Sequence, residues 1–310
     1  MIQRLQLITK VIYLLVTVVL AFSGCKNKED ALTLATYTYS TNNRIDNLKP
    51  LSYDLEKILE RRVEIKSYPD VLSFINGIKS NDVDIGFINT LGYLLLSLDN
   101  KNMQPIATLK VRDDAVDNYK TVLLTNNEDI TDSTSLKKNA DKLSMTFVAT
   151  GSTSGNLVPR LFLSSIGIES PEKHFKEVNY GGNHTTTLEK LKTGKTDICA
   201  IGSNEYCEQL QKDSTLLQST KVLWMSKEIP LGPVLVNKEF SGLDKERIIT
   251  LLVNLHETGP ETFKSIKEGW SEAKQVEKFY PITDKYYDCF RKVDGKSTHL
   301  SAVLNSFVGY

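Results

Sequence analysis

Hydroxyl side chains and glycines are concentrated in the run Thr-Gly-Ser-Thr-Ser-Gly at 150–155. An apolar pattern typical of a strand precedes this run, and a helical pattern begins at Ser154. The first N–H groups of a helix lack intrahelical partners and carry partial positive charge. Ser152, Thr153 and Ser154 would add hydroxyl donors, and Gly155 would let the backbone come close to a ligand. The run therefore predicts a binding site for a tetrahedral oxyanion.

Three other interpretations of the same run predict different functions. A nucleotide-hydrolysing P-loop needs a lysine after the second glycine, where this chain has Asn156. A hydrolase nucleophile elbow needs G-x-S-x-G, whereas Thr153 stands midway between the glycines and no aspartate lies between the run and His184. We therefore expect no enzyme. A plain Ser/Thr helix cap remains an alternative, although one capping residue would suffice for it.

Three further strand-to-helix junctions carry polar donors. The segment 180–187 has two glycines followed by Asn183 and His184, whose imidazole could donate to an anion. The pairs Asn89-Thr90 and Ser203-Asn204, the latter followed by Glu205, have the same character. In open α/β sheets ligands bind beyond the carboxyl ends of the strands, so we expect these junctions to gather there.

Strand-like and helix-like patterns alternate along most of the chain. Residues 31–110 and 119–226 each form one such block, and the first helical pattern of the first block runs from Pro50 to Arg61. This alternation predicts a parallel sheet covered by helices. The short strand 233–237 follows, and then the helical patterns 244–257, 260–268 and 271–279. We expect two α/β units followed by a helical tail.

Length and charge set limits on the function. The 310 residues suggest two compact domains, and 40% of them are hydrophobic. The 38 basic and 38 acidic side chains balance, so nothing in the totals indicates a nucleic-acid-binding surface.

The amino-terminal segment is typical of an export signal. Arg4 and Lys10 precede the uncharged stretch 11–22, which is too short to span a bilayer, and Ser23 and Gly24 lead into Cys25. Cleavage before Cys25 would leave a mature chain with a net side-chain charge of −2. Attraction of an anion would then have to come from the local donors at 152–155 and 184.

The remaining cysteines have no metal-binding spacing. Cys199, Cys207 and Cys289 include no CxxC or Cys/His pattern, so we expect no metal and no cofactor. Cys199 lies in an apolar run and is expected to be buried. The sequence leaves open whether Cys207 forms a bridge with one of the others.

Several of these motifs together resemble a known family. The segment around Cys25 resembles a bacterial lipoprotein box, which implies a lipidated cysteine, a signal peptide at 1–24 and a tether at 25–30. The run 151–159, His184, the segments 194–205 and 229–238 resemble the phosphate/phosphonate-binding receptors of ABC importers. That resemblance implies a type-II periplasmic-binding-protein fold: two α/β lobes, a two-stranded hinge and a ligand cleft.

The resemblance also implies domain limits and site residues. Lobe one would comprise 31–119 with 227–310, and lobe two 120–226. The implied oxyanion-binding residues are Tyr119, Ser152, Thr153, Ser154, Gly155 and His184, with Thr90, Asn204 and Glu205 as further candidates.

The chain departs from the aminoethylphosphonate receptors of this family at three positions. Val71 stands where those receptors have tyrosine, and Gly232 and Asn204 where they have acids, although neighbouring Glu205 could replace the latter. A desolvated ammonium group needs acidic partners, so these changes argue against aminoethylphosphonate as ligand.

We therefore expect a monomeric, lipid-anchored receptor on the outer face of the cell membrane. It would bind phosphate, phosphite or a simple phosphonate and deliver it to an ABC permease. It would contact the membrane only through its lipid and would bind no nucleic acid. The alternative is a signalling or adhesion lipoprotein with the same fold and a different ligand or none.

Overall fold

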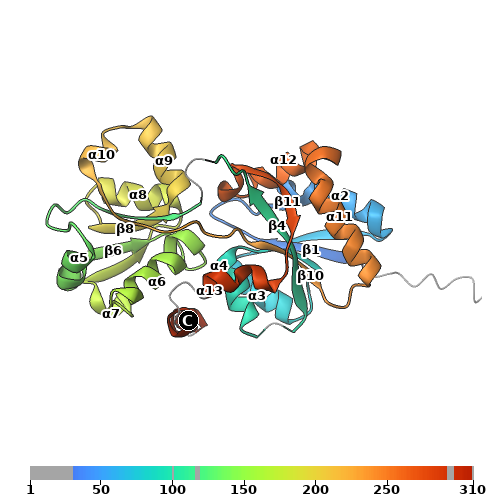
Figure 1. Cartoon of the computed structure of the whole chain (residues 1–310), viewed down its shortest axis with the longest axis horizontal. Helices are drawn as coiled ribbons and strands as arrows, with labels where there is room; N and C mark the ends of the chain where they lie inside the picture. The colour runs from blue at the N-terminus through green and yellow to red at the C-terminus, as the bar shows by residue number, and fades with distance from the viewer. Residues whose placement is uncertain (1–30, 100, 116–118, 292–296, 309–310) are drawn as a thin grey trace, which may run out of the picture.

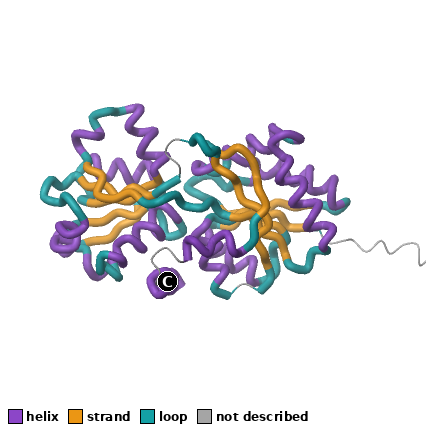
Figure 2. The backbone as a smooth tube through the Cα atoms, in the orientation of Figure 1, coloured by secondary structure: helices purple, strands orange, loops and turns teal. Residues whose placement is uncertain are grey.

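The computed structural model describes residues 31–99, 101–115, 119–291 and 297–308. The predicted signal peptide and Cys25 lie outside these residues. Two α/β lobes lie side by side (Figure 1), and each has a sheet with helices on both of its faces (Figure 2).

Lobe one is built on a six-stranded sheet in the order β11-β4-β10-β3-β1-β2. Its strands are β1 (Leu32–Tyr37), β2 (Val63–Tyr68), β3 (Ile85–Phe87), β4 (Met103–Val111), β10 (Pro233–Asn237) and β11 (Val276–Pro281). Its helices are α2 (Ile45–Leu59), α3 (Val71–Lys79), α4 (Thr90–Ser97), α11 (Gly242–Thr258), α12 (Pro260–Glu268), η3 (Ser271–Ala273), η4 (Asp284–Tyr287) and α13 (Asp288–Arg291).

Lobe two is built on a five-stranded sheet in the order β7-β6-β8-β5-β9. Its strands are β5 (Thr121–Thr125), β6 (Ser144–Phe147), β7 (Glu177–Tyr180), β8 (Ile198–Gly202) and β9 (Lys221–Met225). Its helices are α5 (Ser133–Asn139), η1 (Ala140–Lys142), η2 (Thr153–Leu157), α6 (Val158–Ser165), α7 (Pro171–His174), α8 (His184–Lys192), α9 (Ser203–Lys212) and α10 (Leu216–Ser219).

The prediction of parallel sheets is only partly correct. Strands β1, β2 and β3 are parallel to one another, as are β6, β7 and β8, but β10 and β11 run against their neighbours in lobe one and β5 does so in lobe two. Both β5 and β10 are the first strands after the chain passes from one lobe to the other. They enter the sheet from the hinge end and so run opposite to the strands beside them.

The hinge consists of the two passages of the chain between the sheets. The first leads from β4 to β5 and the second from β9 to β10. The Ile229 N–H donates to Tyr119 O (2.8 Å), and the Ser226 N–H donates to Thr121 O (3.0 Å). The two passages are therefore hydrogen-bonded to each other as a two-stranded connection.

Two predicted elements differ in the structure. The segment 271–279 is not a helix: a short 3₁₀ turn is followed by β11, which pairs with β4 and buries Val276 and Phe279. Pairing with an open sheet edge overrides a local helical pattern. The helix expected from Pro50 begins at Ile45, because the side-chain oxygens of Asn42 and Asn43 accept the N–H groups at its start.

The C-terminal helix α14 (Ser297–Val308) lies against lobe two. Although the domain limits expected above assign the whole of 227–310 to lobe one, α14 packs on α6 (Figure 1). Its buried residues Leu300, Val303, Leu304 and Phe307 share an apolar cluster with Leu157 and Val158 of lobe two and with Tyr287 of lobe one. This cluster joins the two lobes.

Lobe one has a further apolar cluster on the opposite face of its sheet, and lobe two has one of its own on each face. Within the described residues, no helix combines the length and the apolar character needed to cross a membrane.

Candidate functional site

The hydroxyl-rich run forms a wide turn between β6 and α6. It opens with Ser152, whose Oγ accepts the N–H of Gly155 at 3.0 Å and whose carbonyl accepts the N–H of Leu157 at 3.1 Å. That second bond spans five residues, so residues 153–157 form a π-turn before the α-helix proper begins at Val158. The N–H groups of Thr153 and Ser154 open this turn and have no partner within it.

A buried network holds the turn in place. Asn156 Nδ2 donates to Thr150 O (2.9 Å), and Asn156 Oδ1 accepts from Arg160 Nε (2.7 Å). The Arg160 guanidinium lies over the Phe147 ring and forms a bidentate ion pair with Glu172. These contacts fix the turn on the side that faces α6. The opposite side of the turn is thereby preorganised.

The Ser154 hydroxyl is the clearest unsatisfied donor in this region. The residue has no exposed surface, and its Oγ has no hydrogen-bond partner. The Tyr119 hydroxyl lies near it without completing a hydrogen bond, and burial raises the pKa of Tyr119 well above its usual value. A Cβ atom added to Gly202 would lie 3.3 Å from Ser154 Oγ and 3.4 Å from His184 Cε1, so this glycine leaves room where the two side chains meet.

His184 is positioned as a neutral donor. It opens α8, whose N-cap Asn183 accepts the N–H of Thr186. The N–H of Gly202 donates to His184 Nδ1 at 3.0 Å. Nδ1 therefore carries no proton, and the hydrogen of the neutral ring is on Nε2. Burial lowers the pKa of His184 to about 4, so the ring stays neutral at physiological pH.

Tyr119 and His184 face a small cavity between the two lobes. It has a volume of about 20 Å³. Lobe two contributes Ser152, Thr153 and His184, the hinge contributes Tyr119, and lobe one contributes Tyr37, Tyr39, Arg44, Asn89, Ser271 and Glu272. Like Ser154, Tyr39 has a buried hydroxyl without a hydrogen-bond partner. Ser154 is not among the residues that line this cavity, but it lies next to two that are, Tyr119 and His184, so the region offers one unsatisfied hydroxyl from each lobe.

The sequence interpretation missed Arg44, the positively charged residue of this cavity. Its side chain is 3% exposed, its Nε donates to Gly269 O (2.8 Å), and its guanidinium lies over the rings of Tyr37 and Trp270. It forms no ion pair with any side chain in the described ranges. A buried cation without a counter-ion favours an anion beside it. The sequence feature that could have indicated Arg44 is its position in the polar loop after the first strand. This loop resembles the four strand-to-helix junctions considered above.

The lobes touch across the cavity. Asn89 Nδ2 of lobe one donates to Gly151 O (2.8 Å), and the Leu91 N–H donates to Thr153 Oγ1 (3.0 Å). A Cβ atom on Gly151 would come within 2.5 Å of Val71 Cγ1. The molecule is therefore in a closed arrangement, and Gly151 permits the close approach.

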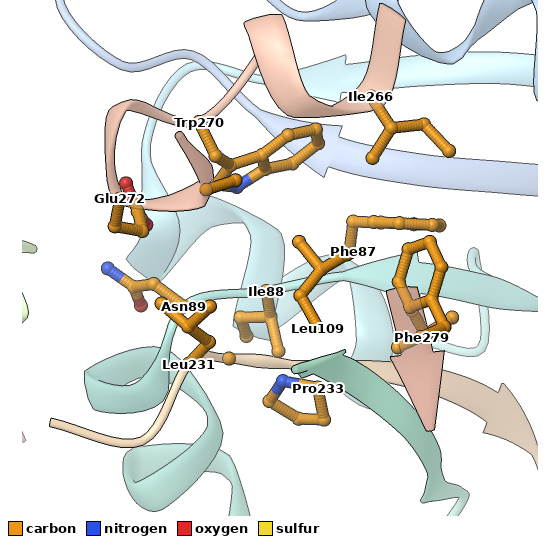
Figure 3. Close-up of a pocket in the computed structure, with 13 residues that line it drawn as sticks. Phe87, Ile88, Asn89, Leu109, Leu231, Pro233, Ile266, Trp270, Glu272 and Phe279 are labelled. Carbon is orange, nitrogen blue, oxygen red and sulfur yellow. The ribbon is translucent and has the colours of Figure 1, made fainter. Parts of the chain in front are cut away.

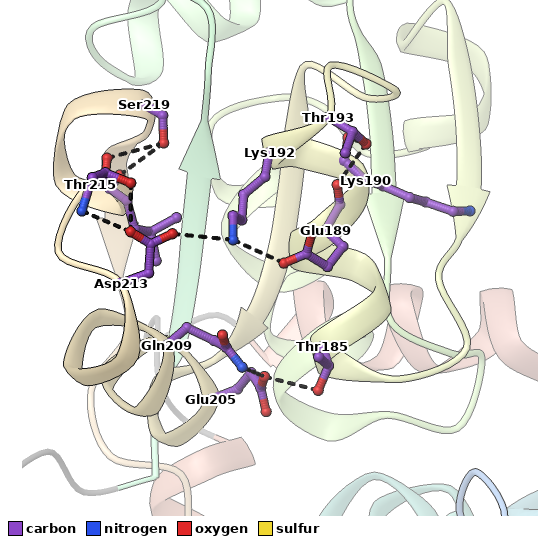
Figure 4. Close-up of polar contacts among 11 residues, drawn as sticks. Thr185, Glu189, Lys190, Lys192, Thr193, Glu205, Gln209, Asp213, Thr215 and Ser219 are labelled. Atoms are coloured by element: carbon purple, nitrogen blue, oxygen red, sulfur yellow. Dashed lines mark hydrogen bonds and ion pairs between the residues drawn. The ribbon is translucent and has the colours of Figure 1, made fainter.

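The other candidate residues have different surroundings. Gly155 and Thr90 are buried outside the cavity lining, and the Thr90 hydroxyl donates to Pro230 O. Asn204, in the first turn of α9, does not line the cavity either. Glu205 accepts hydrogen bonds from Thr185 and Gln209, both at 2.9 Å, and the bond from Thr185 ties α8 to α9 (Figure 4).

The two other positions that depart from aminoethylphosphonate receptors are tightly packed. A Cβ atom at Gly232 would lie 1.9 Å from Ile88 O, so no acidic side chain fits there without a backbone shift. Val71 is buried against Gly151. At these two positions, near the oxyanion donors, lobe one is therefore closely packed.

The described cysteines form no disulfide. Cys199 is buried, and burial raises its pKa; Cys207 is partly exposed. The side chain of Cys289 lies outside the described residues. In the part of the chain that the structure describes, no group of histidine, cysteine and acidic residues has the arrangement of a metal site.

Comparisons with known proteins show which family the chain resembles. A family model described as the periplasmic substrate-binding protein of phosphonate ABC transporters matches residues 35–287. The phosphonates-binding periplasmic protein of Escherichia coli (strain K12) is 24% identical over 259 residues, which are 83% of this chain and 75% of that protein. A "Probable ABC transporter phosphite binding protein PhnD1" of Prochlorococcus marinus (strain MIT 9301) is 27% identical over 184 residues, or 57% of this chain and 59% of that protein.

A solved structure supports the fold. PhnD1 of Prochlorococcus marinus (MIT 9301) in complex with methylphosphonate superimposes with a TM-score of 0.66 at 21% identity, covering 88% of this chain and all of that one. The two lobes and the hinge thus form the type-II periplasmic-binding-protein fold. The relatives are extracytoplasmic transport receptors and not enzymes. The chain belongs to the phosphonate-binding family of periplasmic substrate-binding proteins of ABC transporters.

Proposed function

We propose that this protein captures a small phosphorus oxyanion, such as phosphate, phosphite or a simple phosphonate, between its lobes. The buried, unpartnered Ser154 hydroxyl carries the proposal. It lies next to Tyr119 and His184, which line the cavity together with Arg44. An oxyanion there would satisfy donors that are otherwise desolvated without a partner, which is costly.

The names of similar proteins support a small ligand. One relative is named for phosphite, and the solved structure of PhnD1 contains methylphosphonate. The cavity of about 20 Å³ also favours a compact ligand over a long-chain one. Closure would remove water, which strengthens each hydrogen bond to the anion.

The test is titration calorimetry of the purified protein with phosphate, phosphite and methylphosphonate. We expect Ser154→Ala and His184→Ala each to weaken binding by about 10- to 100-fold, because each removes a hydrogen bond to a charged group. The melting temperature of the ligand-free protein should change little. Ser165→Ala, an exposed serine at the end of α6, is the matched control and should bind normally.

Two outcomes would contradict the proposal. Unaltered affinity in both variants would show that the site is elsewhere. No gain in thermal stability with any of the three anions would favour a signalling or adhesion protein, since a true receptor is stabilised by its ligand through mass action.

The anchor and the partner complete the proposal. The protein would be held to the membrane by a lipid on Cys25 and would deliver its ligand to an ABC permease. It would act as a monomer with lobe one at 31–119 with 227–310 and lobe two at 120–226, and the last helix of the first range, α14, would connect the two. Three fatty acyl chains are more than the two signals needed for stable attachment. Cys25→Ala should move the protein from the membrane to the soluble fraction, and light scattering should give the mass of one chain.

A further inference from the structure

A carboxylate shares the cavity with the oxyanion donors. Glu272 lies in the 3₁₀ turn η3, between α12 and β11, and lines the cavity together with Ser152, Thr153 and His184. Ser271 Oγ donates to Glu272 Oε2 at 3.3 Å. Glu272 forms no ion pair among the described residues. A carboxylate in an anion site repels a ligand that offers only lone pairs.

The groups that face Glu272 are neutral except for Arg44. Tyr37, Tyr39 and Tyr119 each have a pKa raised by burial and, to a lesser degree, by the charge of Glu272, so their hydroxyls stay protonated. His184 is neutral above a pKa of about 4.

On its other side, Glu272 borders an apolar cavity of about 30 Å³ (Figure 3). Figure 3 shows Glu272 and Asn89 at one end of this cavity, with Trp270, Leu109 and Phe279 forming its apolar walls. None of its lining residues is basic. On this side, therefore, no cationic residue faces Glu272.

The charges of the cavity determine which hydrogen-bonding groups the ligand must carry. Among the residues that the structure describes, Arg44 and Glu272 are the only charged ones that line it, and their formal charges cancel. A fully ionised oxyanion could use Arg44 but would place lone pairs against the carboxylate. An oxyanion with one hydroxyl could accept from Arg44 and His184 and donate its own proton to Glu272.

The small size of the cavity indicates that the proton donated to Glu272 belongs to the oxyanion and not to a substituent on it. A space of about 20 Å³ leaves no room for an aminoalkyl chain beyond the oxyanion itself. The ammonium group of such a chain is the other donor that could satisfy a carboxylate.

We propose that Glu272 makes the site selective for oxyanions that carry a hydroxyl proton and excludes those, such as sulfate, that carry none at neutral pH. This inference rests on the proposed function, because it concerns the same cavity. A site built to accept a hydrogen bond from a ligand hydroxyl rejects an analogue that lacks it by a large factor.

The experiment is calorimetry with phosphate, phosphite, methylphosphonate and sulfate between pH 6 and 9. Phosphite and methylphosphonate lose their last hydroxyl proton near neutral pH, whereas phosphate keeps one throughout this range. We expect phosphate to bind more than about 100-fold tighter than sulfate. The Kd of phosphite and methylphosphonate should rise by up to about tenfold per pH unit at the alkaline end, and that of phosphate should stay nearly constant.

Glu272→Gln is the decisive variant. Its amide can donate to an ionised oxygen, so the alkaline rise in the Kd of methylphosphonate should disappear and sulfate should gain at least about tenfold in affinity. Glu268→Gln, an exposed acid four residues earlier in the chain, is the matched control and should behave as the wild type. If Glu272→Gln fails to fold, the selectivity and pH profile of the wild type still test the inference.

The outcomes separate this inference from the proposed function. Tight binding of sulfate by the wild type, or a methylphosphonate affinity that does not change with pH, overturns the role of Glu272 and leaves the proposed function intact. Binding of 2-aminoethylphosphonate more than tenfold tighter than methylphosphonate also overturns it, because the donor is then an ammonium group. Failure to bind any phosphorus oxyanion overturns both.

Discussion

At the residue scale, the protonation of the site is determined by neighbouring backbone groups and by burial. His184 Nδ1 accepts the N–H of Gly202, which leaves the ring hydrogen on Nε2. Burial disfavours the charged ring and lowers the pKa of His184 to about 4. Protonation of Nδ1 would also break this bond. The ring can thus donate one hydrogen bond to an anion without carrying a charge. Positive charge comes from Arg44 instead.

We predict that His184 does not titrate between pH 8 and 5 in the folded, ligand-free protein. Its ring resonances, followed by NMR, should show a midpoint near pH 4, and the same histidine in urea should titrate near the ordinary value of about 6.5. Because the pKa is lower in the folded state, the associated stability is complete above about pH 6.5 and is lost progressively as the pH falls toward 4. A folded-state midpoint near 6.5 would contradict the assigned hydrogen-bonding role.

At the element scale, the oxyanion turn depends on the helix behind it. Arg160 of α6 connects the turn, through Asn156, to Glu172 of α7, and it also donates to the Tyr180 hydroxyl at the end of β7 (3.2 Å). Burial by itself would raise the pKa of Glu172, but the hydrogen bond and charge of Arg160 outweigh it and lower the pKa. This pair therefore stabilises the position of the turn as well as the packing of lobe two.

We predict that Glu172→Gln lowers the free energy of unfolding by about 1–2 kcal/mol at pH 7. This is less than the cost of breaking a fully buried pair, because the Glu172 side chain is 35% exposed and its interaction is partly screened. The stability that Glu172 contributes is present above its unfolded-state pKa and is lost as the pH falls through the lower folded-state pKa. The difference between the two proteins should therefore shrink in acid.

Urea unfolding at pH 7, 5 and 3 measures this effect. Glu169→Gln, an exposed acid three residues earlier, should have no such effect. An equal loss of stability in the two variants, or a difference that is constant with pH, would show that Arg160 does not depend on Glu172.

At the scale of the whole molecule, binding requires two lobes that fit together closely. Gly151 of lobe two lies against Val71 of α3 in lobe one, and Asn89 bridges the lobes by its bond to Gly151 O. Helix α14 adds a further connection, because its apolar face packs on α6 while the preceding α13 belongs to lobe one. The closed arrangement is thus determined by contacts that neither lobe has alone.

We predict that Gly151→Ala weakens methylphosphonate binding by tenfold or more by holding the lobes apart. The added methyl group would lie 2.5 Å from Val71 Cγ1. The double variant Gly151→Ala with Val71→Ala should recover most of the affinity, because it removes the γ-carbons of Val71. Calorimetry measures the affinity, and small-angle scattering should show a larger radius for the single variant in saturating ligand. Failure of the second substitution to restore binding would mean that the defect is local to the turn.

The sequence by itself determined the local parts of this protein. Alternating apolar patterns predicted most strands and helices, and the glycines and hydroxyls at 151–155 indicated an oxyanion turn, because helix starts and tight turns depend on nearby residues. These features require no knowledge of distant contacts.

The tertiary structure alone decided which residues share the cavity. Arg44 and Glu272 are separated by more than 200 residues in the sequence, and neither belongs to a local motif. The sequence pattern did not indicate Glu272, because this residue lies in the segment 271–279, whose helical pattern gave way to pairing between β11 and β4. Whether a charge is buried, and what faces it, depends on how the lobes pack, and no local pattern encodes that packing.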